Sequence, residues 1–256
     1  MNRCSGGAKT IQATSRRIPA CRSRPERKGD RFALLIMATP LDILITGGTG
    51  YIGRNLIPPL IARGHRVRVL AREASVARVP QGASGVIGDA LDDRSVATAL
   101  HTSDTLVHLV GTPHPTPSKA DQFEKVDLIS IRASVNAARQ VGIEHLVYVS
   151  VAHPAPIMQA YLWVRTLGET MIREAGITAT ILRPWYVIGP GRQWPKLILP
   201  LYKLAEFFPG TRSAAERLGL VTIEQFITAM ISAAENPPIP GQRRIIDVPA
   251  IKRARL

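Results

Sequence analysis

Three glycines at regular spacing form the most distinctive motif of the chain. Gly47, Gly50 and Gly53 follow the apolar run 41–46 and precede a helix-like pattern at 51–63. In such a strand–turn–helix the first glycine allows a tight turn, the second lets the backbone approach a pyrophosphate, and the third lets the helix pack close to the sheet. The phosphates then lie at a helix N-terminus, which favours negative charge. We therefore expect a dinucleotide site rather than a glycine-rich turn without a ligand, with contacts from Gly47, Thr49, Gly50, Tyr51, Ile52 and Gly53.

The residues after the second apolar run bear on which dinucleotide is bound. Arg72 lies 19 residues beyond Gly53, where the strand-like run 66–71 ends. In this fold an acidic residue near that position bonds the ribose 2′-hydroxyl of NAD, whereas arginine accommodates the 2′-phosphate of NADP. Arg72 therefore favours NADP(H), while Glu73 keeps NAD(H) possible. The alternative is a solvated arginine that opens the next helix.

Three further residues follow or close later strand-like runs. Asp89 lies where the adenine edge is expected, and its carboxylate either accepts the adenine amino hydrogens or caps a helix that begins near Asp92. Gly111 would let the backbone approach the cofactor. His108 alternates with apolar residues, which favours a place in the core over a catalytic role.

A second constellation lies in a helical stretch. Tyr161, Arg165 and Glu169 are spaced i, i+4 and i+8, so they share one helix face. A cation one turn away favours the ionised form of a phenol, which makes Tyr161 a candidate acid or base. Ser150, expected at the end of a strand, is a candidate to bind a carbonyl oxygen beside that phenol. The alternative is a partly buried helix with an ordinary Arg165–Glu169 ion pair.

Four motifs in order resemble the short-chain dehydrogenases/reductases over about 41–190. They are the glycine loop, Tyr148-Val149-Ser150, Tyr161-x-x-x-Arg165 and Leu182-Arg183-Pro184. The resemblance is to the extended and atypical branch, which includes sugar-nucleotide epimerases, NmrA-like proteins and accessory NADH-dehydrogenase subunits of the complex I type. The segment 183–191 looks most like the atypical bacterial members.

The resemblance implies roles for particular residues. Ser150 and Tyr161 would be catalytic, Arg165 would bind the nicotinamide ribose and assist Tyr161, and Pro184 would contact the cofactor. Two positions depart from the family pattern: it has lysine at 165, and many relatives have asparagine where this chain has Asp127. Arginine is permanently charged and cannot join a proton relay as lysine can. Both departures leave cofactor binding intact and bring hydride chemistry into question.

Alternating strand-like and helix-like patterns predict the elements that position these residues. The α/β alternation indicates a doubly wound parallel Rossmann sheet with a small C-terminal lid region. We expect strands at about 41–46, 66–71, 84–88, 104–110, 145–150 and 178–183, and helices at about 51–63, 92–101, 119–142 and 157–175. Glycines 64, 142 and 176 should end helices. Thr222 should cap a helix to Glu235, and a last strand at 244–248 should precede a basic tail.

Composition divides the chain into two parts. Its formal charge is +14, and residues 1–36 hold nine of the 33 Lys and Arg but two of the 19 acidic residues. We therefore expect 1–37 to be a basic, disordered extension. It is a transit peptide, a basic arm, or a segment upstream of a start at Met37, the last being preferred. Residues 38–256 form the NAD(P)-binding Rossmann domain, with 191–256 as the substrate-side lid.

Cysteine and histidine usage narrows the chemistry. Both cysteines, Cys4 and Cys21, lie in the extension, which excludes thiol catalysis and cysteine-bound metal in the domain. The six histidines show no paired ligand spacing, so we expect no metal. The apolar segment 192–210 is interpreted as a lid or as a contact surface for a peripheral membrane or a partner subunit. A cytoplasmic protein that binds no nucleic acid is expected.

These patterns favour one function and leave two alternatives. The favoured one is an NADP(H)-dependent oxidoreductase that acts on a small carbonyl or quinone-like substrate through Tyr161, Arg165 and Ser150. The second is a dinucleotide-binding accessory or sensor protein without chemistry of its own, which the arginine at 165 supports. The third is a sugar-nucleotide epimerase, for which the C-terminal part is short.

Overall fold

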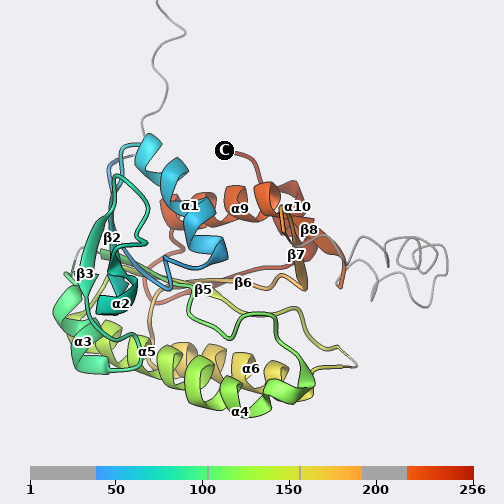
Figure 1. Ribbon diagram of the computed structural model, residues 1–256. Helices are drawn as coiled ribbons and strands as arrows, with labels where there is room; N and C mark the ends of the chain where they lie inside the picture. The colour runs from blue at the N-terminus through green and yellow to red at the C-terminus, as the bar shows by residue number, and fades with distance from the viewer. Residues whose placement is uncertain (1–38, 103, 156, 192–217) are drawn as a thin grey trace, which may run out of the picture. The chain divides into compact units, whose positions relative to one another are not determined.

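A parallel sheet of seven strands underlies the part of the chain that the computed structural model describes, residues 39–256 except 103, 156 and 192–217. The strand order is β3-β2-β1-β4-β5-β6-β9 (Figure 1). The order reverses between β1 and β4, which is the switch point where open α/β sheets bind ligands. The strands are β1 Asp42–Thr46, β2 Arg66–Ala71, β3 Ser84–Ile87, β4 Asp104–His108, β5 His145–Val149, β6 Ala179–Leu182 and β9 Arg243–Ile246.

Helices cover both faces of this sheet (Figure 1). One face carries α1 Tyr51–Ala62, α9 Ile223–Glu235 and α10 Val248–Arg253. The other face carries α3 Asp93–Ala99, α5 Ile129–Val141 and α6 Gln159–Glu174. Because both faces are covered, the central strands are near-continuous runs of apolar residues. The shorter helical segments are α2 Glu73–Val76, η2 Pro117–Lys119, α4 Ala120–Gln122 and η3 Phe123–Leu128, the last with π-helical geometry.

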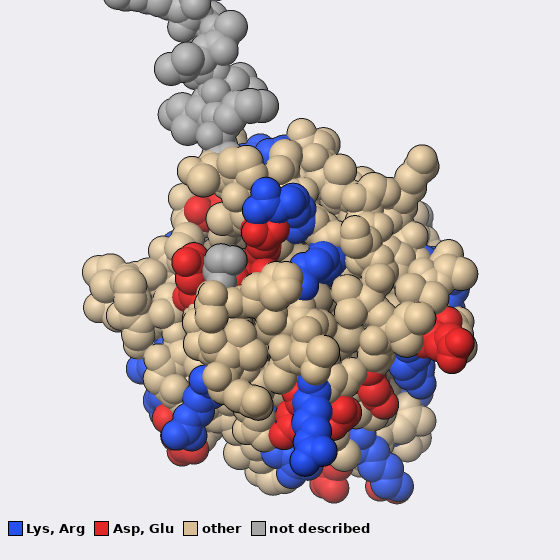
Figure 2. All heavy atoms as spheres, turned by 90° about the vertical axis from the view of Figure 1, so that its left-hand side faces the viewer, with Lys and Arg blue, Asp and Glu red and all other residues tan. Residues whose placement is uncertain are grey.

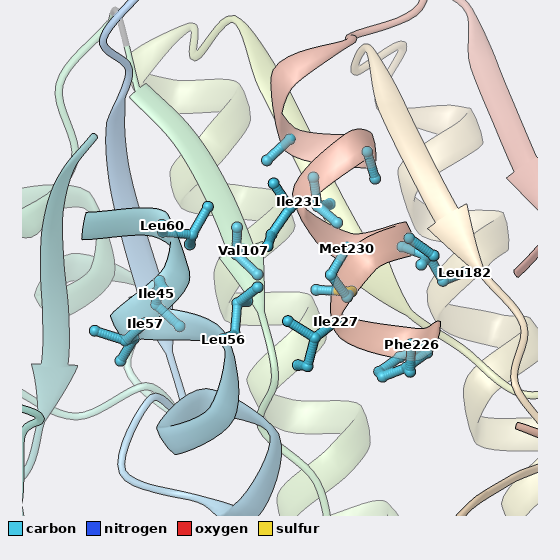
Figure 3. Packing of buried hydrophobic residues seen from close by; sticks show 14 of the residues in the cluster. Ile45, Leu56, Ile57, Leu60, Val107, Leu182, Phe226, Ile227, Met230 and Ile231 are labelled. Carbon is cyan, nitrogen blue, oxygen red and sulfur yellow. The ribbon is translucent and has the colours of Figure 1, made fainter. Parts of the chain in front are cut away.

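The larger core cluster lies between the sheet and the α1–α9 layer. In Figure 3, Leu56 and Leu60 of α1 lie on the side of that helix toward α9, whereas Ile57 lies on the side away from α9. All three belong to one core cluster with Ile227 and Met230 of α9 and with strand residues beneath them. All of these side chains are at least nine-tenths buried. Burial of each such side chain contributes roughly 1.5–3 kcal/mol, so this contact holds α9 on the sheet.

A charged cluster joins the same two helices at the opposite end of the strands from the glycine loop. Arg63 donates from Nε and Nη2 to the Glu235 carboxylate at 2.5 and 2.8 Å. His65 lies 3.0 Å from Glu235 Oε1 through Nε2, and its Nδ1 accepts from the backbone N–H of Leu41. Burial alone would raise the pKa of Glu235, but the hydrogen bonds from Arg63 and His65 outweigh it and hold that pKa below the usual range.

The strand and helix predictions agree closely with the structure up to β6. The three helix-ending glycines, 64, 142 and 176, all have left-handed φ angles of 68° to 88°. Thr222 forms a capping box with Gln225 at the start of α9, as expected of a cap. The doubly wound architecture is confirmed.

The C-terminal part differs from the expectation. The last strand ends at Ile246, because Asp247 caps α10 by accepting from the backbone N–H of Ala250. The expected basic tail is therefore a short helix with buried Val248 and Ile251. A small parallel pair, β7 Tyr186–Ile188 and β8 Leu220–Thr222, was not anticipated.

These elements change the interpretation of 191–256 as a lid. Strand β9 is the edge strand of the main sheet, and α9 belongs to its principal core. Residues 218–256 are thus part of the sheet domain itself. The segment 192–217, including the apolar stretch 192–210, lies outside the described residues, and so does the whole of the extension 1–37.

Charged side chains on the face at the β3 edge are of both signs and interspersed (Figure 2). That face therefore carries no large patch of one sign among the described residues. Within the same part of the chain, no helix has the length and apolarity needed to cross a bilayer.

Candidate functional site

The glycine loop connects β1 to α1 at the switch point, and its backbone geometry explains the glycines. Gly47 has a φ of 75°, and a Cβ there would lie 2.7 Å from the backbone carbon of Leu109. A Cβ on Gly53 would lie 2.2 Å from the carbonyl oxygen of Gly48. Gly50 occupies the N-cap position of α1, and its N–H donates to the carbonyl of Gly47 at 3.0 Å. The loop thus brings a helix N-terminus against bare backbone, which suits a pyrophosphate.

Two hollows meet at this loop and divide the site into halves. One has a volume of about 260 Å³ and the other about 300 Å³, and both are lined by Gly47, Gly50, Leu109 and Gly111. The first lies toward the ends of β4, β5 and β6, and the second toward the ends of β2 and β3. An extended ligand crossing the glycine loop would occupy both, as the two nucleotides of a dinucleotide do in this fold.

The half at β2 and β3 contains Arg72 and Asp89. Arg72 is exposed at the N-cap of α2 and lines the hollow together with Ser75, whose hydroxyl accepts from Arg78 at 2.7 Å. Glu73 is exposed but does not line the hollow.

Asp89 lines the same half and is not a helix cap. The capping alternative for Asp89 is wrong, because Asp92 caps α3 by accepting from the Ser95 N–H at 3.0 Å. Asp89 instead accepts from the N–H of Leu91, also at 3.0 Å, in a tight turn. Its carboxylate has capacity left for a ligand donor.

The half at β4, β5 and β6 brings the other candidates together. Tyr161, Arg165, Ser150 and Pro184 all line it, as do the glycine loop residues Gly47, Gly50, Tyr51 and Ile52. The Tyr161 ring contacts Phe123, at 5.1 Å between ring centroids, and the Arg165 guanidinium, at 5.1 Å from the ring centroid. The cation therefore faces the ring of the tyrosine.

Arg165 is held by partners that its sequence position does not suggest. Its Nη2 donates to Asp127 Oδ1 at 2.6 Å, and its Nη1 to the carbonyl of Val149 at 3.0 Å. Its Nε finds no hydrogen-bond partner among the described residues, although Arg165 is buried and lines the cavity. Burial would lower the pKa of Arg165, but the nearby Tyr161, Tyr148 and Asp127 together raise it. The group stays a cation with one donor available to a ligand.

Ser150 is also engaged, contrary to the expectation of a hydroxyl free to bind a carbonyl oxygen. Its Oγ donates to Glu169 Oε1 at 2.5 Å. Glu169 in turn receives both Nε and Nη2 of Arg183. The expected Arg165–Glu169 pair on one helix face is wrong, since each residue pairs with a different element. Because the Ser150 hydroxyl uses its single proton in the hydrogen bond to Glu169, only its lone pairs are available to the cavity.

Sequence reasoning did not single out Thr112, which donates to Asp127 from its N–H and its hydroxyl. It named Glu169 and Arg183 within motifs but gave them no supporting role in the site. Asp127 was noted as a departure from the family pattern, and that departure was the one signal available for it. His108 is fully buried and contacts Thr46, Ser130 and Ser134. Burial lowers the pKa of His108 to about 3, so it is a neutral core residue. Among the described residues, no three His, Cys, Asp or Glu side chains gather as metal ligands would.

The cradle fits a dinucleotide on its own geometry: Cβ atoms would fill the loop, and a buried guanidinium nitrogen of Arg165 has no partner within the described part of the chain. A doubly wound sheet with a glycine loop at its switch point defines the class of dinucleotide-binding Rossmann proteins. Comparison with protein families makes the assignment narrower. Residues 47–193 match the NAD(P)H-binding family, and the chain belongs to it.

Similar proteins are known in several bacteria. The chain is 27% identical to a ceramide reductase of Caulobacter vibrioides (strain NA1000 / CB15N) over 76% of its own length and 61% of that protein. It is 27% identical to the 4-hydroxy-2-methyl-3-oxo-4-farnesyl-3,4-dihydroquinoline-1-oxide ketoreductase of Stigmatella aurantiaca, over 57% and 50% of the two chains. The chain therefore spans between half and two thirds of the length of these relatives.

Solved structures show the same fold. A short-chain dehydrogenase/reductase superfamily protein from Agrobacterium tumefaciens with bound NAD superposes with a TM-score of 0.59 at 18% identity, over 82% of this chain and 80% of that one. At this identity the likeness concerns the fold alone.

Proposed function

We propose that the chain is an NAD(P)H-dependent oxidoreductase that prefers NADP(H) and reduces a small carbonyl or quinone-like compound. The observation that carries this proposal is the 260 Å³ cavity, which joins Tyr161, Ser150 and Arg165 to the glycine loop. A bound reduced cofactor supplies the hydride, so the chain has to supply binding, a proton and exclusion of water.

Tyr161 is the group placed to give the proton. Its side chain lines the cavity, and its ring contacts both Phe123 and the Arg165 guanidinium. The Ser150 hydroxyl donates to Glu169, so its oxygen is suited to accept a hydrogen bond from the phenol. Arg165, whose Nε is unpaired as far as the described residues go, is suited to bind a ribose hydroxyl.

The preference for NADP(H) rests on the other hollow. Arg72 and the Ser75 hydroxyl line it, and both are donors that suit a 2′-phosphate. An exposed arginine also leaves room for the added phosphate. Glu73, the acidic residue next to Arg72 in the chain, would favour NAD(H), and it lies outside the lining.

The relatives support the class of reaction. Both are named reductases, and one is named for a quinoline-derived ketone. Because this chain spans only part of their length, the substrates in their names are not assigned to this chain.

Calorimetric titration of the full 256-residue chain with NADPH and with NADH tests the cofactor part. Tight and selective NADPH binding is expected, and binding of neither would overturn the proposal.

Tyr161→Phe tests the reaction on a panel of small aldehydes, ketones and quinones, measured as NADPH oxidation. Turnover should fall by about 10²–10⁴-fold, the usual contribution of a positioned acid, while the NADPH dissociation constant stays within about twofold.

A dinucleotide-binding accessory or sensor protein is the second candidate. The observation in its favour is that Arg165 and Ser150 are both committed to partners within the protein. This candidate predicts tight NADPH binding, no oxidation of NADPH by any carbonyl in the panel, and co-purification with a partner protein. Turnover that depends on Tyr161 would exclude it.

A further inference from the structure

The two departures from the family pattern contact each other. Asp127 Oδ1 and Arg165 Nη2 lie 2.6 Å apart, with 0% and 7% of the respective side chains exposed. The residues are 38 positions apart and come from η3 and α6. A carboxylate in place of asparagine and a guanidinium in place of lysine thus form one buried ion pair.

The surroundings of Asp127 require a carboxylate rather than an amide. Its Oδ2 accepts from both the N–H and the hydroxyl of Thr112, at 2.8 and 2.7 Å, and its Oδ1 accepts from Arg165. All three partners are used as donors, and an ionised carboxylate has only acceptors to offer them. An asparagine would direct its NH₂ group against a donor on one side or the other.

The surroundings of Arg165 require a guanidinium rather than an ammonium. It bridges Asp127 and the carbonyl of Val149 with different nitrogens. Its Nη2 lies where a Cβ on Gly111 would be 2.3 Å away, so it rests against bare backbone in the cavity wall. Lysine has one nitrogen on a shorter stem, which reaches fewer of these positions at once.

The helix that carries Asp127 is irregular at this point. The segment η3 has π-helical geometry, which occurs mostly as single turns within α-helices and frequently at functional sites. Asp127 is 1% exposed within it. Through Thr112 the same carboxylate also holds the loop after β4, whose residues Gly111 and Thr112 line the cavity.

We propose that Asp127 is a positioning residue of the dinucleotide site. Its carboxylate fixes the Arg165 guanidinium against Gly111 and under Tyr161, so that arginine rather than lysine serves the nicotinamide half in this chain. The inference rests on the proposed function in requiring a dinucleotide, but it needs no turnover. The two departures are then a matched pair.

A double-mutant cycle tests this inference by binding. The variants are D127N, R165K and D127N/R165K of the full chain, titrated with NADPH and with adenosine 2′,5′-bisphosphate, which fills only the Arg72 half. Each single variant should weaken NADPH binding about tenfold, equivalent to about 1.4 kcal/mol. Adenosine 2′,5′-bisphosphate should bind within about twofold of the parent, since its half of the site is untouched.

The double variant should bind NADPH at least about fivefold more tightly than the product of the single effects predicts. The reason is that an amide at 127 no longer faces a guanidinium once lysine stands at 165. D121N is the matched control: Asp121 forms an exposed pair with Lys125 at 3.7 Å in the same helical segment, and its loss should leave both ligands unaffected.

Each outcome decides the inference. Additive effects on NADPH, equal losses for both ligands, or a double variant that fails to fold with both singles would overturn it. A D127N chain that fails to fold while D127N/R165K folds would support it, because the coupling then appears in folding. A chain that binds NADPH with this coupling but reduces nothing would overturn the proposed function alone.

Discussion

The two halves of the site are built by different means. The Arg72 half depends on backbone: the Gly47 turn, the close contact of Gly53 with Gly48, and strand ends that leave a hollow. The Tyr161 half depends on side chains fixed by buried ion pairs, Arg165 with Asp127 and Arg183 with Glu169. In the first half, side chains near the glycine loop can vary, but a Cβ on the loop glycines cannot be accommodated. In the second half, replacing one member of an ion pair leaves a buried charge without its partner.

The difference teaches where specificity in this chain is set. A backbone cradle binds the part that all dinucleotides share. The ion pair with Asp127 fixes the position of the Arg165 guanidinium, and the hydrogen bond to Glu169 fixes the Ser150 hydroxyl, so these contacts determine which groups face a substrate. Changes in the first half should therefore alter cofactor binding, whereas changes in the second should alter the position of catalytic groups and the stability of the fold.

Gly53→Ala should have the largest effect. A Cβ at 2.2 Å from the Gly48 carbonyl oxygen forces the loop and α1 apart, so we expect dinucleotide binding to fall by more than about 100-fold and stability by about 3 kcal/mol. Calorimetry and urea unfolding measure the two effects.

Gly142→Ala is the matched control for that substitution. Gly142 has a φ of 72°, but a Cβ there would meet nothing within 4 Å. It should cost only the strain of a left-handed residue, about 1–2 kcal/mol, with binding unchanged. Equal binding losses in the two variants would contradict the backbone account of the first half.

Glu169→Gln should come next and act in the second half. It removes the charge that pairs with Arg183 and replaces one of the two carboxylate oxygens by an NH₂ group that cannot accept, so we expect a loss of about 3 kcal/mol in unfolding free energy. Adenosine 2′,5′-bisphosphate binding should not change. Glu174→Gln, an exposed residue on the same helix, is the control and should stay within about 0.5 kcal/mol. A similar loss of unfolding free energy in both variants would contradict the role of Glu169 in fixing the second half.

Glu235→Gln tests an ion pair outside the site, for comparison with the Glu169–Arg183 pair of the second half. Glutamine keeps one acceptor oxygen but loses the charge and one of the two oxygens that accept from Arg63, which should lower stability at pH 7 by about 2 kcal/mol without changing NADPH affinity. The folded-state pKa of Glu235 is below its ordinary value, so its stabilisation is present above that ordinary value and is lost as pH falls through the folded-state pKa. The difference between parent and variant should therefore shrink below about pH 4, as urea unfolding at several pH values would show. A difference that grows with acid would contradict this.

Sequence reasoning reached the first half better than the second for a physical reason. The glycine loop is local: turn, helix start and close packing all follow from residues within one strand–turn–helix. The partners of Arg165 and Ser150 lie 38 and 19 residues away and depend on how η3 and α6 pack. The spacing rule for residues four apart on a helix predicted a pair between Arg165 and Glu169. In the structure each forms its ion pair with a residue from another element instead, Asp127 and Arg183 respectively. The helix α10 was missed because its cap, Asp247, follows a strand directly.

Arg72→Ala should have the smallest effect on the protein and the sharpest on ligand choice. Arg72 is exposed and lines the hollow at the end of β2, so its loss should leave stability within about 0.5 kcal/mol. NADPH binding should weaken by about tenfold, as the loss of one charge-assisted contact predicts, while NADH binding stays within about twofold. The control is Arg94→Ala, an exposed arginine on α3 outside both hollows. Equal losses for the two cofactors would show that Arg72 acts through general charge, and the choice between NADP(H) and NAD(H) would then lie in the backbone of the same half.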